Sequence, residues 1–369
     1  MQYNLFPIIP FNFLKHPGYT RFLAFTFYIA AQAFFMHAIF FRISSFFVAL
    51  TFTVAAVAQQ PLYKDRTQPV EKRVADLLSK MTPEEKFWQL FMIPGDLDDA
   101  KPAQYKNGLF GFQVIGKAKG DAAGQLLSYN TNEDALLVIK KINSIQKYFV
   151  EQTRPGIPII AFDEALHGLV RSQATAFPQA IGLAATWDTP LVHRVASDIA
   201  DQVKARGIRQ ILSPVVNIAS DVRWGRTEET YGEDPFLVSA MGVAFISAFE
   251  RRGIITTPKH FVANVGDGGR DSYPIHFNER FLNEIHFPPF INAIKKAGAR
   301  SIMTSYNSVD GTAASSNKWL LIDQLKKNWG FNGFVISDAN AVGGETVLHH
   351  TAKDYEESGA HAINGGLDV

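Results

Sequence analysis

The sequence predicts an α/β fold, a (β/α)8 barrel of the TIM type. Short apolar runs rich in β-branched residues alternate with longer helical patterns along most of the chain. Such strands between helices are typical of βαβ units in a parallel sheet. Six or seven units follow one another, and the Gly-rich first turn of a dinucleotide-binding sheet is missing. Both observations favour a barrel over a doubly wound sheet.

Composition sets broad limits on the kind of protein. The chain has 369 residues, of which 47% are hydrophobic and 19% are charged, and this indicates a globular protein. The formal net charge of +1 gives no reason to expect nucleic acid as a partner. Cysteine is absent, which excludes disulfides and thiolate metal sites. We expect neither a cofactor nor a metal.

The first 58 residues differ from the rest of the chain. From residue 22 to residue 58 the only formally charged side chain is Arg42. In one interpretation this region is a membrane anchor, because residues 22–41 alone are long enough to span the hydrocarbon of a bilayer. In the other, translation begins at Met36 and the region is a signal peptide.

The signal-peptide interpretation gives each part of this region a role. Arg42 forms the positive n-region, residues 46–54 form the apolar h-region, and Ala-Val-Ala at 56–58 is the cleavage site. We favour this interpretation because the A-x-A tripeptide lies where an h-region of that length would put it. Under either interpretation the remainder is exported, to the periplasm or the extracellular space. An uncleaved segment would instead hold it at the membrane.

A short linker, residues 59–72, precedes the barrel domain, which we expect over residues 73–369. The pattern predicts a helix over Val70–Lys80. A second helix follows Thr82, which is expected to be its N-cap, with Pro83 at the first position and Glu85 completing a capping box.

The remaining elements alternate as a barrel requires. Strands are predicted at residues 157–162, 210–212, 254–257, 301–305 and 333–337. Helices are predicted at residues 132–151, 190–206, 236–251, 279–296 and 318–328. Residues 94–124 are interpreted as loops around one strand, at 109–115. The last residues, 366–369, resemble the middle of a strand, so we expect a sequence truncated at its C-terminal end.

Polar side chains follow five of the predicted strands. In chain order they are Asp163 and Glu164, the loop at residues 213–235, Lys259 and His260, Tyr306 with Asn307, and Asp338. Barrel enzymes build their active sites at the C-terminal ends of the strands, so we expect these positions to share one rim.

The residue types at this rim suit a neutral, hydroxyl-rich ligand. Charged groups make strong hydrogen bonds to vicinal hydroxyls, and Trp187 and Trp224 can offer apolar faces to a sugar. A carboxylate nucleophile suits attack on an anomeric carbon, whose transition state is cationic. A zinc site is weakly supported because H-E-x-x-H is absent. The pair His349-His350 is interpreted as a surface loop.

Eight segments, in order, give the sequence a family resemblance. They are RVADLLSKMTPEEK, IPIIAFDEALHG, FPQAIGLAATWD, SPVVNIASDVRWGRTEETYGEDP, TTPKHFVAN, SIMTSYNSVDG, WLLIDQLKKNWGFNGFVISD and GGLDV. From about residue 73 to residue 369 the chain resembles the N-terminal barrel domain of glycoside hydrolase family 3, which contains β-glucosidases and β-xylosidases.

The resemblance implies a nucleophile and several sugar-binding residues. Asp338 matches the family's nucleophile, in GFVISD. Glu164 matches the acidic residue that holds hydroxyls of the terminal sugar, with Asp163 as the fallback. Arg226 matches the Arg that binds the same sugar, and Arg223 is the less favoured candidate.

The same resemblance implies further contacts with that sugar. Lys259 and His260 match the family's KH pair, Arg270 matches another basic residue, and Tyr306 matches the aromatic residue near the nucleophile. Glu229 and Glu233 are expected to hold their loop through ion pairs.

One departure from the family concerns the acid/base carboxylate. The family usually supplies it from a second, α/β sandwich domain, which we expect to be absent from this chain. A branch of the family, the β-N-acetylhexosaminidases, instead uses a His-Asp dyad after KH. Asp271 and His276 occupy that loop without the branch's sequence pattern.

The resulting expectation is a retaining β-glycosidase that acts on terminal β-D-glycosyl residues of an oligosaccharide or glycoside. Glucose and xylose both remain open as the sugar. The alternatives are a catalytically impaired fragment that only binds sugar, a barrel lyase or aldolase with Lys259 as a Schiff base, and a pseudogene product.

Overall fold

The computed structural model describes residues 60–369 apart from 96, 98–101, 115, 119–126, 130–132 and 270, and also the single positions 28, 32 and 36. The predicted signal peptide or anchor therefore lies almost wholly outside the described residues. No helix in the described part of the chain is both long and apolar enough to cross a membrane. The chain divides into two compact units, Met1–Ser79 and Lys80–Val369.

The described part of the first unit is short and helical. A 3₁₀ turn, η1 (Leu62–Lys64), precedes helix α2 (Val70–Lys80), which has the bounds that the sequence predicts. Asp76 accepts a hydrogen bond of 3.0 Å from the backbone N–H of Tyr63, and Arg73 donates one of 2.9 Å to the Tyr63 carbonyl. These bonds fold the segment before α2 back onto the helix.

The second unit is built around parallel strands. Five of them form one sheet in the order β1 (Met92–Gly95), β2 (Gly111–Val114), β5 (Ile160–Asp163), β6 (Gln210–Ile211) and β7 (Ile255–Thr256). A second parallel pair consists of β8 (Ser301–Met303) and β11 (Phe334–Ile336). The sequence misses β1, because Met92–Gly95 carries a Pro and a Gly and lacks a β-branched run.

The two sets of strands are joined through the segment that follows β7. Phe261 makes a parallel bridge to Thr304, just beyond β8, and its N–H donates to the Met303 carbonyl at 2.7 Å. At the far side, Ser337 N–H donates to the Val369 carbonyl at 2.9 Å. The last residues therefore run beside β11, although none of residues 366–369, predicted as part of a strand, is assigned to one.

A small apolar cluster lies inside this arc of strands. Phe162, Leu212, Met303 and Ile336 are buried together, and Met92 and Val369 pack against them. These side chains come from both ends of the arc, as in the filled interior of a barrel. The pairing of the described strands does not close the ring between β1 and the C-terminal segment.

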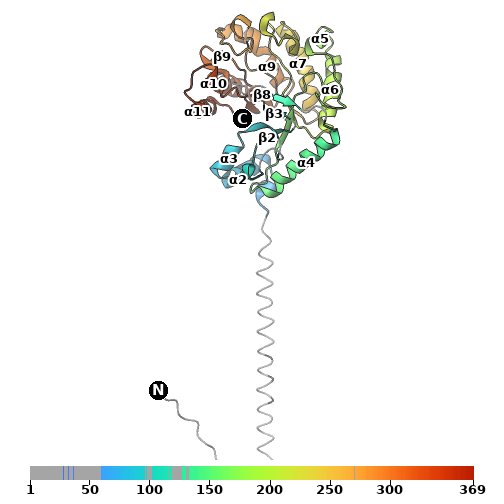
Figure 1. Cartoon of the computed structure of the whole chain (residues 1–369), viewed down its shortest axis with the longest axis vertical. Helices are drawn as coiled ribbons and strands as arrows, with labels where there is room; N and C mark the ends of the chain where they lie inside the picture. Colours follow the sequence, from blue (N-terminus) through green and yellow to red (C-terminus); the bar gives the residue numbers. More distant parts are fainter. Residues whose placement is uncertain are drawn as a thin grey trace, which may run out of the picture. The chain divides into compact units, whose positions relative to one another are not determined.

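Helices form the layer outside the strands (Figure 1). In chain order they are α3 (Pro83–Trp88), α4 (Ala135–Gln152), α5 (Ala180–Ala184), α6 (Thr189–Ala205), α7 (Pro235–Glu250), α8 (Glu279–Phe281), α9 (Phe287–Lys295), α10 (Gly344–Val347) and α11 (Tyr355–Gly365). Two π-helical segments, η6 (Leu282–His286) and η8 (Trp319–Asn328), and several 3₁₀ turns complete the set. The loops also contain two antiparallel strand pairs, β3–β4 (Gly116–Ala118, Leu127–Tyr129) and β9–β10 (Ser308–Val309, Thr312–Ala313).

Local chemistry explains where the helices begin. The capping box before α3 forms as predicted: Thr82 accepts from the Glu85 N–H, and Glu85 accepts from the Thr82 N–H. A single helix over residues 279–296 is wrong, because η6 interrupts it just before Pro288 and Pro289. Proline has no N–H to continue the regular ladder.

Candidate active site

Asp338 lies directly after β11, at the C-terminal end of the parallel strands. Its Oδ1 accepts the Ala339 N–H at 2.8 Å. Its Oδ2 is buried and has no hydrogen-bond partner among the described residues, although His260 Nε2 is 3.4 Å away. Burial raises the pKa of this carboxyl, while Lys259, Arg226 and hydrogen bonds from Ala339 and Tyr306 oppose the rise.

A second carboxylate with a bare oxygen lies nearby. Glu164 follows β5, and its Oε1 forms an ion pair of 2.7 Å with the Lys259 ammonium. Its Oε2 is buried without a hydrogen-bond partner in the described part of the chain. Burial raises the pKa of Glu164, Lys259 lowers it, and the charges of Asp338 and Asp163 raise it further.

Arg226 reaches the same place from the long loop after β6. Its guanidinium donates to both oxygens of Glu229, at 2.8 and 3.0 Å, and it contacts His260 Nε2 at 3.0 Å. Burial opposes its charge, but Glu229 and Asp338 raise the pKa of Arg226 and keep it cationic. The expected ion pair of Glu229 thus exists and holds Arg226, whereas Glu233 is exposed and makes none with the described residues.

The choice between the two arginines of this loop follows from their surroundings. Arg223 is paired with Asp221, and its side chain is 68% exposed. Arg226 is only 23% exposed, and its charge acts on Asp338. The geometry therefore favours Arg226, in agreement with the sequence.

His260 is fully buried, and Arg226 and Lys259 are its charged neighbours. Its backbone and ring contact Asn217 through three hydrogen bonds of 2.8 to 3.0 Å. Burial and the neighbouring charges of Arg226 and Lys259 hold the pKa of His260 well below its ordinary value, so the ring is neutral. Sequence reasoning missed Asn217, because an Asn in a loop carries no signal of its own.

Tyr306 follows β8 and closes another side of the site. Burial is the main cause of the raised pKa of its phenol, and the charge and hydrogen bond of Asp338 add to it. His349 contacts the Tyr306 carbonyl through Nε2 at 2.7 Å and is half-buried. Both histidines lie in the loop between α10 and α11, as the sequence predicts, and His350 is exposed.

Asp163, another predicted contact, is engaged elsewhere. Asp163 is held by Arg171, which donates to both of its oxygens at 2.7 and 2.6 Å in a buried pair. The geometry therefore favours Glu164 over Asp163 as a ligand-binding carboxylate. Arg270 lies outside the described residues.

Trp224 does not offer the open face that the sequence suggests at this rim. Trp224 is buried with Val215 and Val265, and its Nε1 donates to Asp271 at 2.8 Å. Trp187 is 73% exposed, in the turn between α5 and α6. Trp224 instead braces Arg226, whose guanidinium lies 5.9 Å from the ring centre.

Asp271 and His276, the two residues of the loop after KH that could form the dyad, do not pair with each other. His276 Nδ1 contacts Asp267 at 2.9 Å on the surface, and Asp271 is bound to Trp224. Within the described residues, no group of three or more His, Cys, Asp or Glu side chains is arranged to hold a metal ion.

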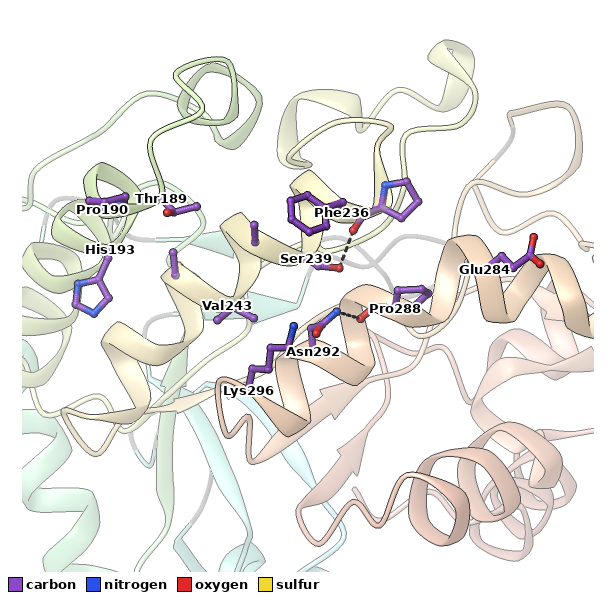
Figure 2. Close-up of a pocket in the computed structure, with 13 residues that line it drawn as sticks. Thr189, Pro190, His193, Phe236, Ser239, Val243, Glu284, Pro288, Asn292 and Lys296 are labelled. Atoms are coloured by element: carbon purple, nitrogen blue, oxygen red, sulfur yellow. Dashed lines mark hydrogen bonds between the residues drawn. The ribbon is translucent and has the colours of Figure 1, made fainter.

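A groove of roughly 650 Å³ lies elsewhere, on the outer helices α6, α7 and α9. Figure 2 shows Phe236, Ser239, Pro288 and Asn292 along it; Ser239 Oγ donates to the Pro235 carbonyl at 2.6 Å, and Asn292 Nδ2 donates to the Pro288 carbonyl at 2.8 Å. None of the rim residues described above lines it. It is therefore a feature of helix packing and not part of the candidate site.

Comparison with known proteins gives a consistent picture. A family model described as the glycosyl hydrolase family 3 N terminal domain matches residues 82–369. A β-xylosidase from Formosa agariphila is 38% identical over 58% of this chain and 32% of its own length. A periplasmic β-glucosidase from Salmonella typhimurium is 30% identical over 87% of this chain and 40% of its own length. The chain thus spans well under half the length of either relative.

Solved structures agree with the sequence comparison. A β-glucosidase from Erythrobacter marinus has a TM-score of 0.73 at 30% identity, over 84% of this chain and 41% of that one. A β-glucosidase from Listeria innocua in complex with glucose has a TM-score of 0.69 at 27% identity, over 81% of this chain and 41% of that one. The family match and these neighbours confirm the predicted barrel fold.

Proposed function

The chain belongs to glycosyl hydrolase family 3, and on this basis we propose that it carries the sugar-binding and nucleophilic part of a retaining β-glycosidase. Asp338 is the proposed nucleophile. The residues proposed to bind the terminal sugar are Glu164, Arg226, Lys259, His260 and Tyr306.

The surroundings of Asp338 carry this proposal. One carboxylate oxygen is buried and has no hydrogen-bond donor among the described residues, while Arg226 and Lys259 favour its charged form. Such an oxygen keeps its lone pairs for an electrophile. An anomeric carbon suits it because the transition state develops positive charge.

The second bare oxygen, on Glu164, supports a hydroxyl-rich ligand. A carboxylate oxygen only accepts hydrogen bonds, so a sugar hydroxyl that donates would satisfy it. Lys259 and Arg226 add donors for the oxygens of the same sugar.

The proposed reaction is a double displacement. Asp338 Oδ2 attacks the anomeric carbon, the bond to the leaving oxygen breaks, and a general acid gives that oxygen a proton. Water then attacks the anomeric carbon of the glycosyl-enzyme, the acid residue now takes the proton, and Asp338 is released as a carboxylate.

The proton donor is proposed to lie in the second domain that the family usually provides. General acid catalysis contributes about 10²–10⁴-fold, so this chain alone should favour aryl glycosides whose leaving group needs little protonation. Both a β-xylosidase and β-glucosidases are among its relatives, so glucose and xylose remain the two candidate sugars. We also propose that the protein is exported, as its N-terminal sequence indicates.

Trapping the covalent intermediate tests the assignment. The full-length enzyme should form an adduct with a 2-fluoro aryl β-glucoside or β-xyloside, and peptide mass analysis should locate it on Asp338. Asp338→Asn should abolish both adduct and turnover, whereas Asp267→Asn, at an exposed surface pair, should retain them. Unchanged hydrolysis by Asp338→Asn would overturn the nucleophile, and sugar binding without any adduct would indicate a binding module.

A further inference from the structure

The amide of Asn217 meets His260 in an arrangement that leaves no freedom in the placing of protons. Asn217 Nδ2 donates to the His260 carbonyl at 2.8 Å, and Asn217 Oδ1 accepts the His260 backbone N–H at 2.8 Å. If the amide were flipped, its NH₂ group would face the His260 N–H, and its oxygen would face the His260 carbonyl oxygen. The backbone of His260 therefore fixes which end of the Asn217 amide is oxygen.

The local fold explains this pairing. The segment after β6 runs parallel to the segment after β7, with a bridge between Val215 and Lys259. Val216 N–H donates to the Lys259 carbonyl at 2.8 Å, and Lys259 N–H donates to the Pro214 carbonyl at 3.0 Å. The Asn217 side-chain amide then acts like a backbone peptide group: it continues the hydrogen-bond pattern of these two parallel segments by pairing with the backbone of His260.

The same oxygen faces the histidine ring. His260 Nδ1 lies 3.0 Å from Asn217 Oδ1, an atom that can only accept, so the ring must carry its proton on Nδ1. On the other side of the ring, Nε2 lies 3.0 Å from Arg226 Nη2, which can only donate. Both partners require the same neutral tautomer.

We propose that Asn217 is a positioning residue that holds His260 in the tautomer with a proton on Nδ1 and a bare lone pair on Nε2. Nε2 is 3.4 Å from Asp338 Oδ2. A proton there would be donated to that oxygen and weaken it as a nucleophile. With Asn217 in place, His260 Nε2 accepts a hydrogen bond from Arg226, and the ring donates none to Asp338 Oδ2.

The tautomer stands on the hydrogen bonds alone, and only its catalytic consequence rests on the proposed function. The test uses the whole chain with ¹⁵N-labelled histidine, and His260→Gln assigns the signals. Native protein should show a protonated Nδ1 and an unprotonated Nε2 through the neutral range. A protonated Nε2 in the native protein would overturn the inference, whatever the variants do.

Variants of Asn217 sharpen the test. Asn217→Ala should mix the two tautomers, and Asn217→Asp, with an anionic acceptor, should yield the doubly protonated ring at a higher pH than in the native protein. Gln210→Leu removes a buried amide that binds Thr257 and not His260, and should leave the His260 signals unchanged. Unchanged ring signals in both Asn217 variants would also overturn the inference.

Turnover separates this inference from the proposed function. In the full-length enzyme, Asn217→Ala should lower kcat by about tenfold and change its pH dependence, because the nucleophile would then share a proton with His260. If the ring signals respond as expected but Asp338→Asn remains active, the tautomer stands and the nucleophile assignment falls. If turnover falls while the ring signals stay unchanged, Asn217 is only structural.

Discussion

Two carboxylates of the site, Asp338 and Glu164, each keep one buried oxygen without a donor among the described residues. Leaving a buried acceptor unsatisfied costs free energy, and binding a donor there recovers it. A ligand rich in hydroxyls can supply that donor in both places. The cations that face these groups, Lys259 and Arg226, offset the cost of burying the charges.

Tyr306 should tune the acid side of the pH–activity profile. Its hydrogen bond lowers the pKa of Asp338, which burial otherwise raises, so Tyr306→Phe should raise that pKa further. Because the nucleophile must be ionised, the acid limb of kcat/KM should move to higher pH, and its maximum should fall about tenfold or more. An acid limb that stays in place would contradict this role. Tyr273→Phe, at an exposed tyrosine, is the matched control.

His286 should make the fold sensitive to acid. Its ring is buried, stacks on Phe277 at 5.1 Å, and neither ring nitrogen has a partner among the described residues. Burial lowers the pKa of His286 from 6.5 to about 4, so on acidification the unfolded chain takes up the proton first. The neutral ring's contribution is complete above pH 6.5 and is lost as pH falls towards 4, by about 3 kcal/mol in all.

The measurement is the unfolding free energy by denaturant titration between pH 7 and pH 4. His286→Phe should flatten the pH dependence in this window, because it keeps the aromatic packing without a titrating group. His276→Gln, at an exposed histidine, should leave the dependence as it is. An equally steep dependence in His286→Phe would show that another group is responsible.

At the scale of single elements, capping residues that can be read from the sequence fix where several helices begin. Asp134, Asp188, Asp234 and Asp354 each accept a backbone N–H from the first turn of α4, α6, α7 and α11. Helix α7 is apolar around most of its surface, since it is buried between α6 and α9. Its start is therefore set by the cap and by Pro235, and its length by packing.

Removing the cap of α7 should weaken the fold modestly. Asp234 accepts the Leu237 N–H at 2.7 Å, so Asp234→Ala should cost about 1 kcal/mol and lower the Tm by about 1–2 °C. Thermal unfolding followed by circular dichroism measures this. Asp234→Asn keeps a capping oxygen and should recover most of the loss, and Glu233→Ala is the control for an exposed neighbour. Equal losses in Asp234→Asn and Asp234→Ala would argue against capping.

At the scale of the whole molecule, the site depends on strands that are distant in sequence. The loop after β5 is anchored by the buried pair of Asp163 and Arg171, and the loop after β6 by the bond of Trp224 to Asp271. Neither pair touches the bare oxygens directly. Their effect is to fix the loops that carry Glu164 and Arg226.

Breaking the buried ion pair should therefore affect stability first. Arg171→Met leaves Asp163 charged and buried, and should cost about 3–5 kcal/mol. Adding Asp163→Leu should restore part of that loss, because no unpaired charge then remains. Arg223→Met, in an exposed pair, should leave the denaturation midpoint nearly unchanged. A double variant no better than Arg171→Met would contradict this account.

Much of the fold could be predicted because local chemistry encodes it. The bounds of α2 and the capping box of α3 follow from residues within one or two turns. Strands β2, β6, β7, β8 and β11 each lie inside a predicted strand, and β5 extends one residue beyond its predicted end. Element β1 and the π-helical turn η6 could not be predicted, because Met92–Gly95 becomes a strand only by pairing with β2, and packing decides how the chain passes Pro288 and Pro289.

The sequence by itself determined the residue types at the strand ends, and so the family and the shared rim of Glu164, Lys259, His260, Tyr306 and Asp338. The tertiary structure alone decided which charges meet. It turned Asp163 towards Arg171, chose Arg226 over Arg223, buried Trp224, and brought Asn217 to the ring of His260. The physical reason is that a motif fixes chemistry and spacing along the chain, whereas hydrogen-bond partners are fixed by three-dimensional packing between segments far apart in sequence.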